Sequence, residues 1–395
     1  MSPSSLATWA ESELEAITAA GRLRSRPVIE GGNDRRIILA EGGRRRSLIN
    51  WASNDYLGNA QALTVRNAAA KAVRSIGAGA GSARLLSGGL RIHRRLEERL
   101  ANWLGCEAVL VTTSGFQGNL AVLATVASGR DDVVILDRLA HASLYDGARL
   151  GSATCQRFAH NDMDALRRRL ESASAARRRV VVVESVYSMD GDEAPLADIA
   201  ELCRAYDAVL MVDEAHALGV HGPGGRGLCA ALGLRPDVVT ATCSKALGSQ
   251  GGIIAAAASV VELIVNRGRS FIFSTAAVPA APAAAIAGLD RLRRDPTMGE
   301  RLLARAAQLR AALQHQGWSV MAGDGPIIPL QIGDEQRTVA LAAALRTRGH
   351  YAPAIRPPTV PPGSCRLRLT LTLAHGSSDW RRLLRALAEI RSEGW

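Results

Sequence analysis

Lysine is almost absent from this chain of 395 residues. Of its 48 basic residues only Lys71 and Lys245 are lysines, so the other 46 (48 − 2) are arginines. Arginine supplies positive charge but cannot be deprotonated in a protein, whereas a lysine amine can act as a base or a nucleophile or form a Schiff base. Lys71 lies in a predicted helix (67–74) and is typical of a surface charge. Lys245 lies among small residues beside a glycine-rich stretch, and we expect it to carry the chemistry.

The chain also lacks paired cysteines and long apolar runs. Its six cysteines are scattered without a Cys-x-x-Cys pair, and its eight histidines show no metal-ligand spacing. Both observations argue against a disulfide scaffold and a zinc site. No apolar run reaches the length of a membrane span, and residues 1–15 lack the basic start and apolar stretch of a signal peptide. We therefore expect a cytoplasmic protein that binds no membrane and no metal.

Acidic residues are outnumbered, and the net charge is +11. Arginines cluster at 44–46, 167–169 and 177–179, which raises the possibility of nucleic-acid binding. No motif of an RNA- or DNA-binding module accompanies these clusters. We interpret them as solvated faces that attract an anionic small substrate. A non-catalytic α/β binding protein associated with nucleic acid remains the alternative from another functional class.

The middle of the chain alternates short apolar runs with helical patterns. Four continuous apolar runs of strand length are typical of strands buried on both faces, as in a parallel sheet covered by helices. Between two of them, Leu196, Ile199 and Cys203 fall on one helical face behind Pro195. The sequence predicts an α/β fold with a mostly parallel central sheet and helices on both faces. The apolar runs are residues 108–111, 133–136, 180–183 and 209–212.

From about Leu289 the pattern changes to a smaller α+β domain. We predict one long helix to about Gln316, strands at 326–332 and 366–372, and a helix at 339–346 between them. A last amphipathic helix is expected, with Ser378 or Asp379 as its N-cap. The predicted division is an N-terminal segment (1–50) packing with the small domain, a large domain (51–288) and a small C-terminal domain (289–395).

Four segments with reactive or polar residues follow predicted strands. Residues 112–119 form a glycine-containing turn that opens a helix, a place that favours a phosphate. Residues 213–216 and 137–143 place an acid and two histidines where α/β sheets bind ligands. Residues 240–245, which lead into the glycine-rich stretch 248–252, place hydroxyls on either side of Lys245, at Thr242 and Ser244 before it and at Ser249 after it. An aromatic cofactor bearing an aldehyde and a phosphate needs these parts: an anion site, a stacking group, a carboxylate for the ring nitrogen and an amine.

At this point the sequence resembles the fold-type-I pyridoxal-phosphate enzymes, and among them the α-oxoamine synthases. The resemblance covers nearly the whole chain and implies pyridoxal 5'-phosphate as cofactor and a homodimer with active sites at the interface. It rests on ordered motifs at residues 53–58, 81–88, 114–116, 141–143, 188–192, 213–216 and 242–248.

The resemblance also implies roles for individual residues. Lys245 would form the Schiff base with the cofactor and later move the substrate proton. Asp213 would pair with the ring nitrogen, His141 would stack on the ring and His216 would bind the phenolic oxygen. The remaining cofactor contacts would come from Gly115, Phe116, Ser188 and Thr242, and from Ser274 and Thr275 of a neighbouring subunit.

The C-terminal segments 354–361 and 366–371 indicate the reaction. They resemble the family member that condenses L-alanine with pimeloyl-CoA, or the pimeloyl-carrier protein, and releases CoA and carbon dioxide on the way to biotin. Arg356 would bind the amino-acid carboxylate. Asn54 would also contact substrate, and Thr359 and Arg24 (or Arg22) would contact the acyl group. A sister synthase that uses glycine or serine remains the alternative within the family.

Overall fold

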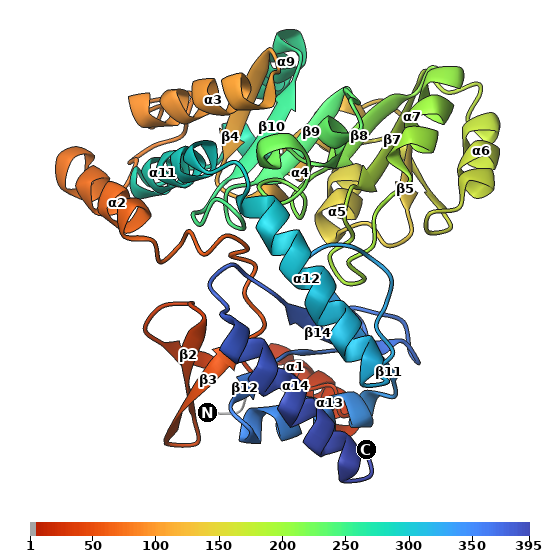
Figure 1. The fold of residues 1–395 in the computed structure, drawn as a ribbon. Helices are drawn as coiled ribbons and strands as arrows, with labels where there is room; N and C mark the ends of the chain where they lie inside the picture. The colour runs from red at the N-terminus through yellow and green to blue at the C-terminus, as the bar shows by residue number, and fades with distance from the viewer. Residues whose placement is uncertain (1–4) are drawn as a thin grey trace.

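A seven-stranded sheet forms the centre of the larger part of the molecule in the computed structural model, which describes residues 5–395 (Figure 1). The strand order is β4-β10-β9-β8-β7-β5-β6. Neighbouring strands run parallel except at β10, which is antiparallel to both β4 and β9. The strands are β4 (Ala108–Thr112), β5 (Asp132–Asp137), β6 (Thr154–Phe158), β7 (Arg178–Glu184), β8 (Val209–Asp213), β9 (Val238–Thr242) and β10 (Gly252–Ala256). The prediction of an α/β fold with a mostly parallel sheet is confirmed.

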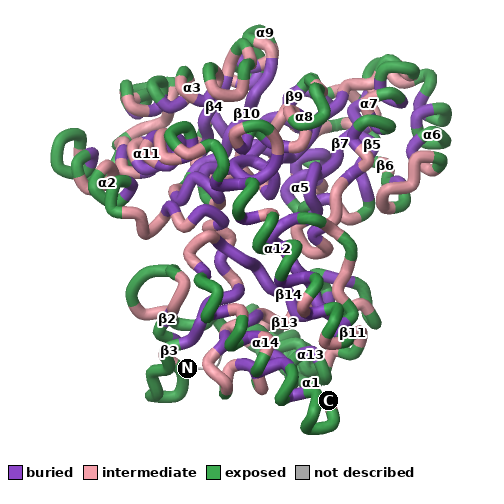
Figure 2. The backbone as a smooth tube through the Cα atoms, in the orientation of Figure 1, coloured by how far each residue is buried: buried purple, intermediate pink, exposed green. Residues whose placement is uncertain are grey.

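Helices cover both faces of this sheet, which explains the continuous apolar runs. In β7, Val180 and Val182 pack under α4 and α5, whereas Val181 and Val183 pack under α6 and α7. Successive side chains of a strand point to opposite faces, so each face needs its own apolar residues. The strands are accordingly the most buried part of the molecule in Figure 2. The helices of this part are α2 (Leu63–Ile76), α3 (Arg91–Leu104), α4 (Gly115–Val126), α5 (Ala142–Leu150), α6 (Met163–Ser172), α7 (Leu196–Ala205), α8 (Leu228–Ala231), α9 (Ala258–Arg267), α10 (Arg269–Ile272) and α11 (Ala280–Arg294), with a 3-10 turn at Pro223–Gly225.

Two smaller sheets form the rest of the molecule. A four-stranded sheet of order β1-β2-β3-β12 joins the N-terminal segment to the C-terminal part, because β12 pairs in parallel with β3. A three-stranded sheet has the order β11-β14-β13. The predicted division into segments 1–50, 51–288 and 289–395 stays a prediction. The elements are α1 (Ser5–Ala19), β1 (Val28–Glu30), β2 (Arg36–Glu41), β3 (Arg44–Asn50), α12 (Met298–His315), β11 (Ile327–Gly333), α13 (Glu335–Thr347), β12 (His350–Tyr351), β13 (Ala354–Ile355), β14 (Cys365–Thr370) and α14 (Ser377–Ser392).

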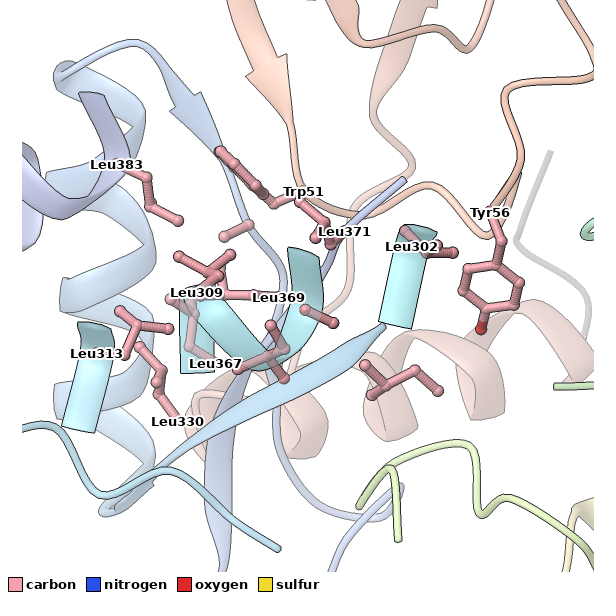
Figure 3. Close-up of a cluster of buried hydrophobic side chains, with 14 of the residues drawn as sticks. Trp51, Tyr56, Leu302, Leu309, Leu313, Leu330, Leu367, Leu369, Leu371 and Leu383 are labelled. Carbon is pink, nitrogen blue, oxygen red and sulfur yellow. The ribbon is translucent and has the colours of Figure 1, made fainter. Parts of the chain in front are cut away.

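The core of this smaller part lies between α12, the three-stranded sheet and α14 (Figure 3). Leu309 and Leu313 of α12 face Leu330 of β11 and Leu367 of β14, and all four are fully buried. Burying a leucine side chain stabilises a fold by about 1.5–3 kcal/mol. The apolar face of α12 thus holds the small sheet together and fixes the position of β14, which contributes to the site described below.

Two sequence predictions in this region are wrong in detail. The single helix expected from Leu289 to about Gln316 is two helices, α11 and α12, because Pro296 lies between them and lacks the N–H that a continuous helix requires. The last helix begins one residue before Ser378, and its N-cap is Gly376. The Asp379 carboxylate instead accepts a hydrogen bond from the Gly376 N–H (2.8 Å).

Across residues 5–395, no helix is both long and apolar enough to cross a bilayer. Within the same residues, no group of three or more histidine, cysteine, aspartate or glutamate side chains is placed to hold a metal ion.

Candidate active site

The reactive residues predicted from sequence meet at the carboxyl ends of the parallel strands. Asp213 is the last residue of β8, Thr242 is the last residue of β9, and Lys245 follows three residues later. His141 lies in the loop after β5 and is the N-cap residue of α5. Parallel strands bring these ends to one edge of the sheet, which is where α/β folds bind ligands.

A tight turn holds Lys245 in place. Gly248 donates its N–H to the Lys245 carbonyl (3.0 Å), and the Asn59 amide donates to the Ala246 carbonyl (2.6 Å). Gly248 has a φ of +65°, and a Cβ there would lie 2.4 Å from the Ala60 nitrogen. The position therefore requires glycine.

The electrostatic surroundings of Lys245 favour its neutral amine. Burial and the nearby Arg368 lower the pKa of Lys245, while Asp213 and Glu184 oppose this effect, and the net pKa is below the usual value. A larger share of the amine is therefore unprotonated near neutral pH, as a nucleophile or base requires.

One hydrogen-bond chain links Asp213 to His141. The Asn119 amide of α4 donates to Asp213 Oδ2 (2.8 Å) and to Ser143 Oγ (2.9 Å), and Ser143 Oγ lies 2.8 Å from His141 Nδ1. The Ala215 N–H donates to Asp213 Oδ1 (2.9 Å). Asp213 is only 7% exposed. Because each carboxylate oxygen has two lone pairs, Asp213 can accept one more hydrogen bond from a ring N–H.

His216 is held by a buried tyrosine. Tyr56 Oη lies 2.6 Å from His216 Nδ1. Burial raises the pKa of Tyr56 to about 12, even though Arg368 lowers it. Burial, followed by the charges of Lys245 and Arg368, lowers the pKa of His216 well below its usual value. His216 is therefore a neutral imidazole with a fixed ring orientation.

The start of α4 forms a place for an anion. Ser114 is its N-cap residue and accepts a hydrogen bond from the Gln117 N–H (3.1 Å). A Cβ on Gly115 would lie 3.5 Å from Thr242 Cβ, so the first turn lies against β9. Thr242 Oγ1 is 2.8 Å from Ser244 Oγ. Helix N–H groups and two hydroxyls thus surround one position suited to a phosphate.

This set of groups fits pyridoxal phosphate. The start of α4 suits the phosphate, Asp213 the ring nitrogen, a neutral His216 the phenolic oxygen and Lys245 the aldehyde. His141 lies at the exposed mouth of the site, where a flat ring can stack. Ser188 is half-buried on the loop after β7, and its carbonyl accepts a hydrogen bond from Arg368 (2.7 Å).

Glu184, the last residue of β7, was not predicted from the sequence. Glu184 pairs in register with Asp213 and is 3% exposed. Burial, and then the charge of Asp213, raise the pKa of Glu184. The N–H groups of His141 and Ser188 donate to its carboxylate, while its Oε1 has no partner. The signal was present in the sequence, since Glu184 ends the run 180–183 just as Asp213 ends 209–212.

Arg368 on β14 is a second residue of the site that was not predicted from the sequence. This arginine is 5% exposed, and its charge lowers the pKa values of Lys245 and His216. Its guanidinium donates to the Ser188 carbonyl (2.7 Å), to Thr370 Oγ1 (3.0 Å) and to Asn54 Oδ1 (3.3 Å). The predicted substrate residue Asn54 is therefore adjacent to Arg368. No feature of the alternating Arg366–Thr370 pattern distinguishes this arginine from Arg366.

Arg356, predicted to bind the amino-acid carboxylate, contacts the N-terminal segment and α13. Its guanidinium donates to the carbonyls of Gly21 and Leu23 and lies 3.4 Å from the Glu335 carboxylate. Arg24 donates to Thr359 Oγ1 (3.1 Å). Arg24, Arg356 and Thr359 line one cavity of about 450 Å³. The structure therefore brings the two predicted acyl-binding residues together and groups Arg356 with them.

Arg22 is not among the residues that line this cavity; it lies 3.7 Å from Glu335. Ser274 and Thr275 line one small cavity together with Thr113 and Gln117. A backbone bridge joins Thr275 to Ala83.

Comparison with known proteins shows which family the chain is similar to. The family model for class I and II aminotransferases matches residues 46–387. The chain is 46% identical to the 8-amino-7-oxononanoate synthase of Anaeromyxobacter dehalogenans, over 97% of this chain and 95% of the relative. It is 43% identical to the enzyme of that name from Geobacter sulfurreducens, over 96% and 97%.

Among solved structures, a serine palmitoyltransferase variant from S. paucimobilis with bound pyridoxal phosphate and myriocin has a TM-score of 0.91 and is 28% identical. The match covers 98% of each chain.

Proposed function

This chain belongs to the class I and II aminotransferase family and within it to the 8-amino-7-oxononanoate synthases, and we propose that it condenses L-alanine with a pimeloyl thioester in biotin biosynthesis. The products are 8-amino-7-oxononanoate, carbon dioxide and the free thiol of the carrier. The observation that carries the proposal is the convergence of Lys245, Asp213 and His141 at one sheet edge, joined through Asn119 and Ser143.

Pyridoxal phosphate is the cofactor, and when bound it would supply the electron sink for the chemistry at the alanine Cα. Asp213 would pair with the ring nitrogen and His216 with the phenolic oxygen. The first turn of α4, with Gly115, Phe116 and Thr242, would hold the phosphate, and His141 would stack on the ring.

Lys245 performs the proton transfers. Its amine would also hold the cofactor through the aldehyde. Because the pKa of Lys245 is lowered, its amine is able to take the Cα proton of alanine near neutral pH. Glu184 holds the backbones of His141 and Ser188 on either side of this reaction centre.

Arg368 binds the alanine carboxylate in this proposal, in place of Arg356. Its buried cation lies beside Lys245 and Asn54. Arg24, Arg356 and Thr359 bind the acyl donor, because they share one cavity with exposed arginines that suit an anionic chain. Both the CoA thioester and the carrier-protein thioester carry the pimeloyl group that this cavity would receive.

A homodimer completes the site in this proposal. Large apolar side chains beside the α4 turn are exposed: Leu86 by 76%, Phe273 by 72%, Leu85 by 49% and Phe116 by 43%. The Ala83–Thr275 bridge brings the first three together, and contacts of Gln117 with Ser270 join α4 to them. Exposed patches of this kind mark association surfaces. The partner would supply Ser274 and Thr275 to the phosphate, and the enzyme would act in the cytoplasm.

The test is an absorbance and product measurement on the purified enzyme and on Lys245→Ala. We expect the wild type to absorb near roughly 400–430 nm. The absorbance should change on addition of L-alanine. The enzyme should release labelled carbon dioxide from carboxyl-labelled alanine only when pimeloyl-CoA is present. Lys245→Ala should bind cofactor without turnover. A wild type that stays colourless with added pyridoxal phosphate would refute the proposal.

A sister synthase is the second candidate, because the S. paucimobilis serine palmitoyltransferase shares the fold at a TM-score of 0.91. The same measurement with glycine or serine in place of alanine distinguishes the sister synthase from the proposed function. A response to serine with palmitoyl-CoA, and none to alanine with pimeloyl-CoA, would assign the sister reaction. One methyl group discriminates by only about 10–200-fold, so weak activity with glycine would not contradict the proposal.

A further inference from the structure

The loop after β7 (residues 186–193) connects the large sheet to the small C-terminal sheet. Its ends are closed by a backbone bridge between Val186 and Glu193. Within it, Tyr187 donates its N–H to the Asp192 carbonyl (2.9 Å), and Gly191 donates to the Tyr187 carbonyl (2.8 Å). These internal hydrogen bonds make loop 186–193 a compact unit.

On one side the loop is attached to β14 and β11. Arg368 Nε donates to the Ser188 carbonyl (2.7 Å), and Arg366 forms an ion pair with Asp190. Gly191 has a φ of +73°, and a Cβ there would lie 2.8 Å from the Ile327 carbonyl oxygen. The position of the loop therefore decides where the Arg368 guanidinium lies.

On the other side the loop is attached to the large sheet through His160. His160 Nδ1 lies 2.9 Å from Asp137 Oδ1 at the end of β5, and His160 Nε2 lies 2.7 Å from Asp192 Oδ2. An ionised carboxylate only accepts, so both ring nitrogens donate, which requires the imidazolium. Asn161, at a φ of +54°, adds hydrogen bonds from its N–H to Asp137 (3.0 Å) and from its amide to Asp192 (3.1 Å).

The groups around His160 keep this charge over the neutral range. Asp137, Asp192 and the more distant Asp190 face it, and the Tyr187 ring lies edge-on at 4.4 Å. Burial lowers the pKa of His160, but the hydrogen bonds to the first two carboxylates outweigh it and raise the pKa to about 9.

We propose that His160 is a positioning residue: its imidazolium fixes loop 186–193 where Ser188 and Asp190 orient Arg368 and Arg366, and so sets the affinity for the amino-acid carboxylate. The inference rests on the proposed function through Arg368. His160 does not touch the reacting atoms, and the mechanism above makes no use of it.

The test compares His160→Gln with His315→Gln, an exposed histidine of α12, as holoenzymes. The dissociation constant of L-alanine is read from the absorbance change of the bound cofactor. We expect His160→Gln to raise it by about tenfold, the order expected for losing a charged hydrogen bond. The cofactor content and the KM for pimeloyl-CoA should stay unchanged, and His315→Gln should match the wild type.

The pH dependence gives a second readout. Because the folded pKa is raised from 6.5 to about 9, the stabilisation from the imidazolium is complete below about 6.5 and lost as the pH rises through about 9. The ratio of the alanine dissociation constants, His160→Gln over wild type, should therefore fall toward one above about pH 9. The thermal midpoints should converge over the same range.

The alanine measurements distinguish a failure of the role of His160 from a failure of the proposed function. An unchanged alanine dissociation constant, with or without a lower thermal midpoint, would overturn the role of His160. A wild type without any alanine response would instead overturn the proposed function. Asp192→Asn, which keeps the shape but removes the acceptor charge, should reproduce the effect.

If both variants fail to fold, nitrogen-15 NMR spectra of the wild type test the proposal by reporting the protonation state of each histidine. One of the eight histidines should be doubly protonated at about pH 8. Its absence would overturn the proposal.

Discussion

The partners of two arginines, Arg356 and Arg368, distinguish their roles at the scale of single residues. Arg356 is paired with Glu335 and with main-chain carbonyls. Arg368 is buried, and within residues 5–395 its hydrogen-bond partners are neutral, with no carboxylate in an ion pair. A buried charge without a counter-ion costs free energy unless a ligand supplies the opposite charge. This difference is the physical reason for assigning the alanine carboxylate to Arg368.

We therefore predict different effects for Arg368→Lys and Arg356→Lys. Lysine keeps the charge but loses the planar fork that binds a carboxylate at two points. Arg368→Lys should raise the dissociation constant of L-alanine by about tenfold or more and leave the KM of pimeloyl-CoA nearly unchanged. Arg356→Lys should raise the KM of pimeloyl-CoA and leave the dissociation constant of L-alanine nearly unchanged. Cofactor-absorbance titrations and steady-state kinetics measure both, and a dependence of alanine binding on Arg356 alone would restore the sequence-based assignment.

At the scale of elements, helix α4 has two functions. Its side chains pack against the sheet, and its first turn provides N–H groups for a phosphate. Ser114 caps this turn in the same way that Asp162 caps α6, where Asp162 accepts a hydrogen bond from the Ala165 N–H (2.8 Å). The two caps are chemically alike, but only one lies at the candidate site.

Replacing each of these two N-cap residues by alanine gives a matched pair of variants. Ser114→Ala and Asp162→Ala should each lower the free energy of unfolding of the apoenzyme by about 1 kcal/mol, since each removes an N-cap hydrogen bond. Only Ser114→Ala should also weaken pyridoxal-phosphate binding, by about fivefold. Denaturation curves and cofactor titrations give the two quantities. Equal cofactor affinity in both variants would argue against a phosphate at the start of α4.

At the scale of the whole molecule, the proposed dimer depends on the exposed apolar patch beside α4 (Leu85, Leu86, Phe116 and Phe273). Leu86 and Phe273 make few contacts within the chain and are largely exposed. In a monomer their replacement would change stability little, whereas in a dimer it would place a charge in a buried interface.

Leu86→Glu should consequently separate the subunits. We expect the dissociation constant of the dimer to rise by about a hundredfold, the effect of roughly 3 kcal/mol. Leu232→Glu, a similarly exposed leucine (52%) that follows α8, is the control and should leave the assembly unchanged. Sedimentation velocity over a concentration series measures both. A wild type that is monomeric at all concentrations would contradict the shared-site proposal.

Sequence alone predicted those parts of the site that depend on residues close together in the chain. The scarcity of lysine identified Lys245, and the position of Asp213 and His141 after apolar runs placed them at one edge of a parallel sheet. Both inferences need only the neighbouring residues, because strand burial and side-chain chemistry are properties of short segments. The α/β class followed from the same runs.

Tertiary structure decided what depends on residues far apart in the chain. Arg368 reaches Ser188 across 180 positions, and His160 meets Asp192 across 32. Both Arg366 and Arg368 are buried on β14 beside loop 186–193, but Arg366 pairs with Asp190, whereas Arg368 donates to the Ser188 carbonyl and, within residues 5–395, pairs with no carboxylate. Sequence therefore determined the class of chemistry and its lysine, because these depend on residue type. Only the fold brings Arg368 to Ser188 and His160 to Asp192, the contacts on which both proposals depend, because these contacts depend on which distant segments meet.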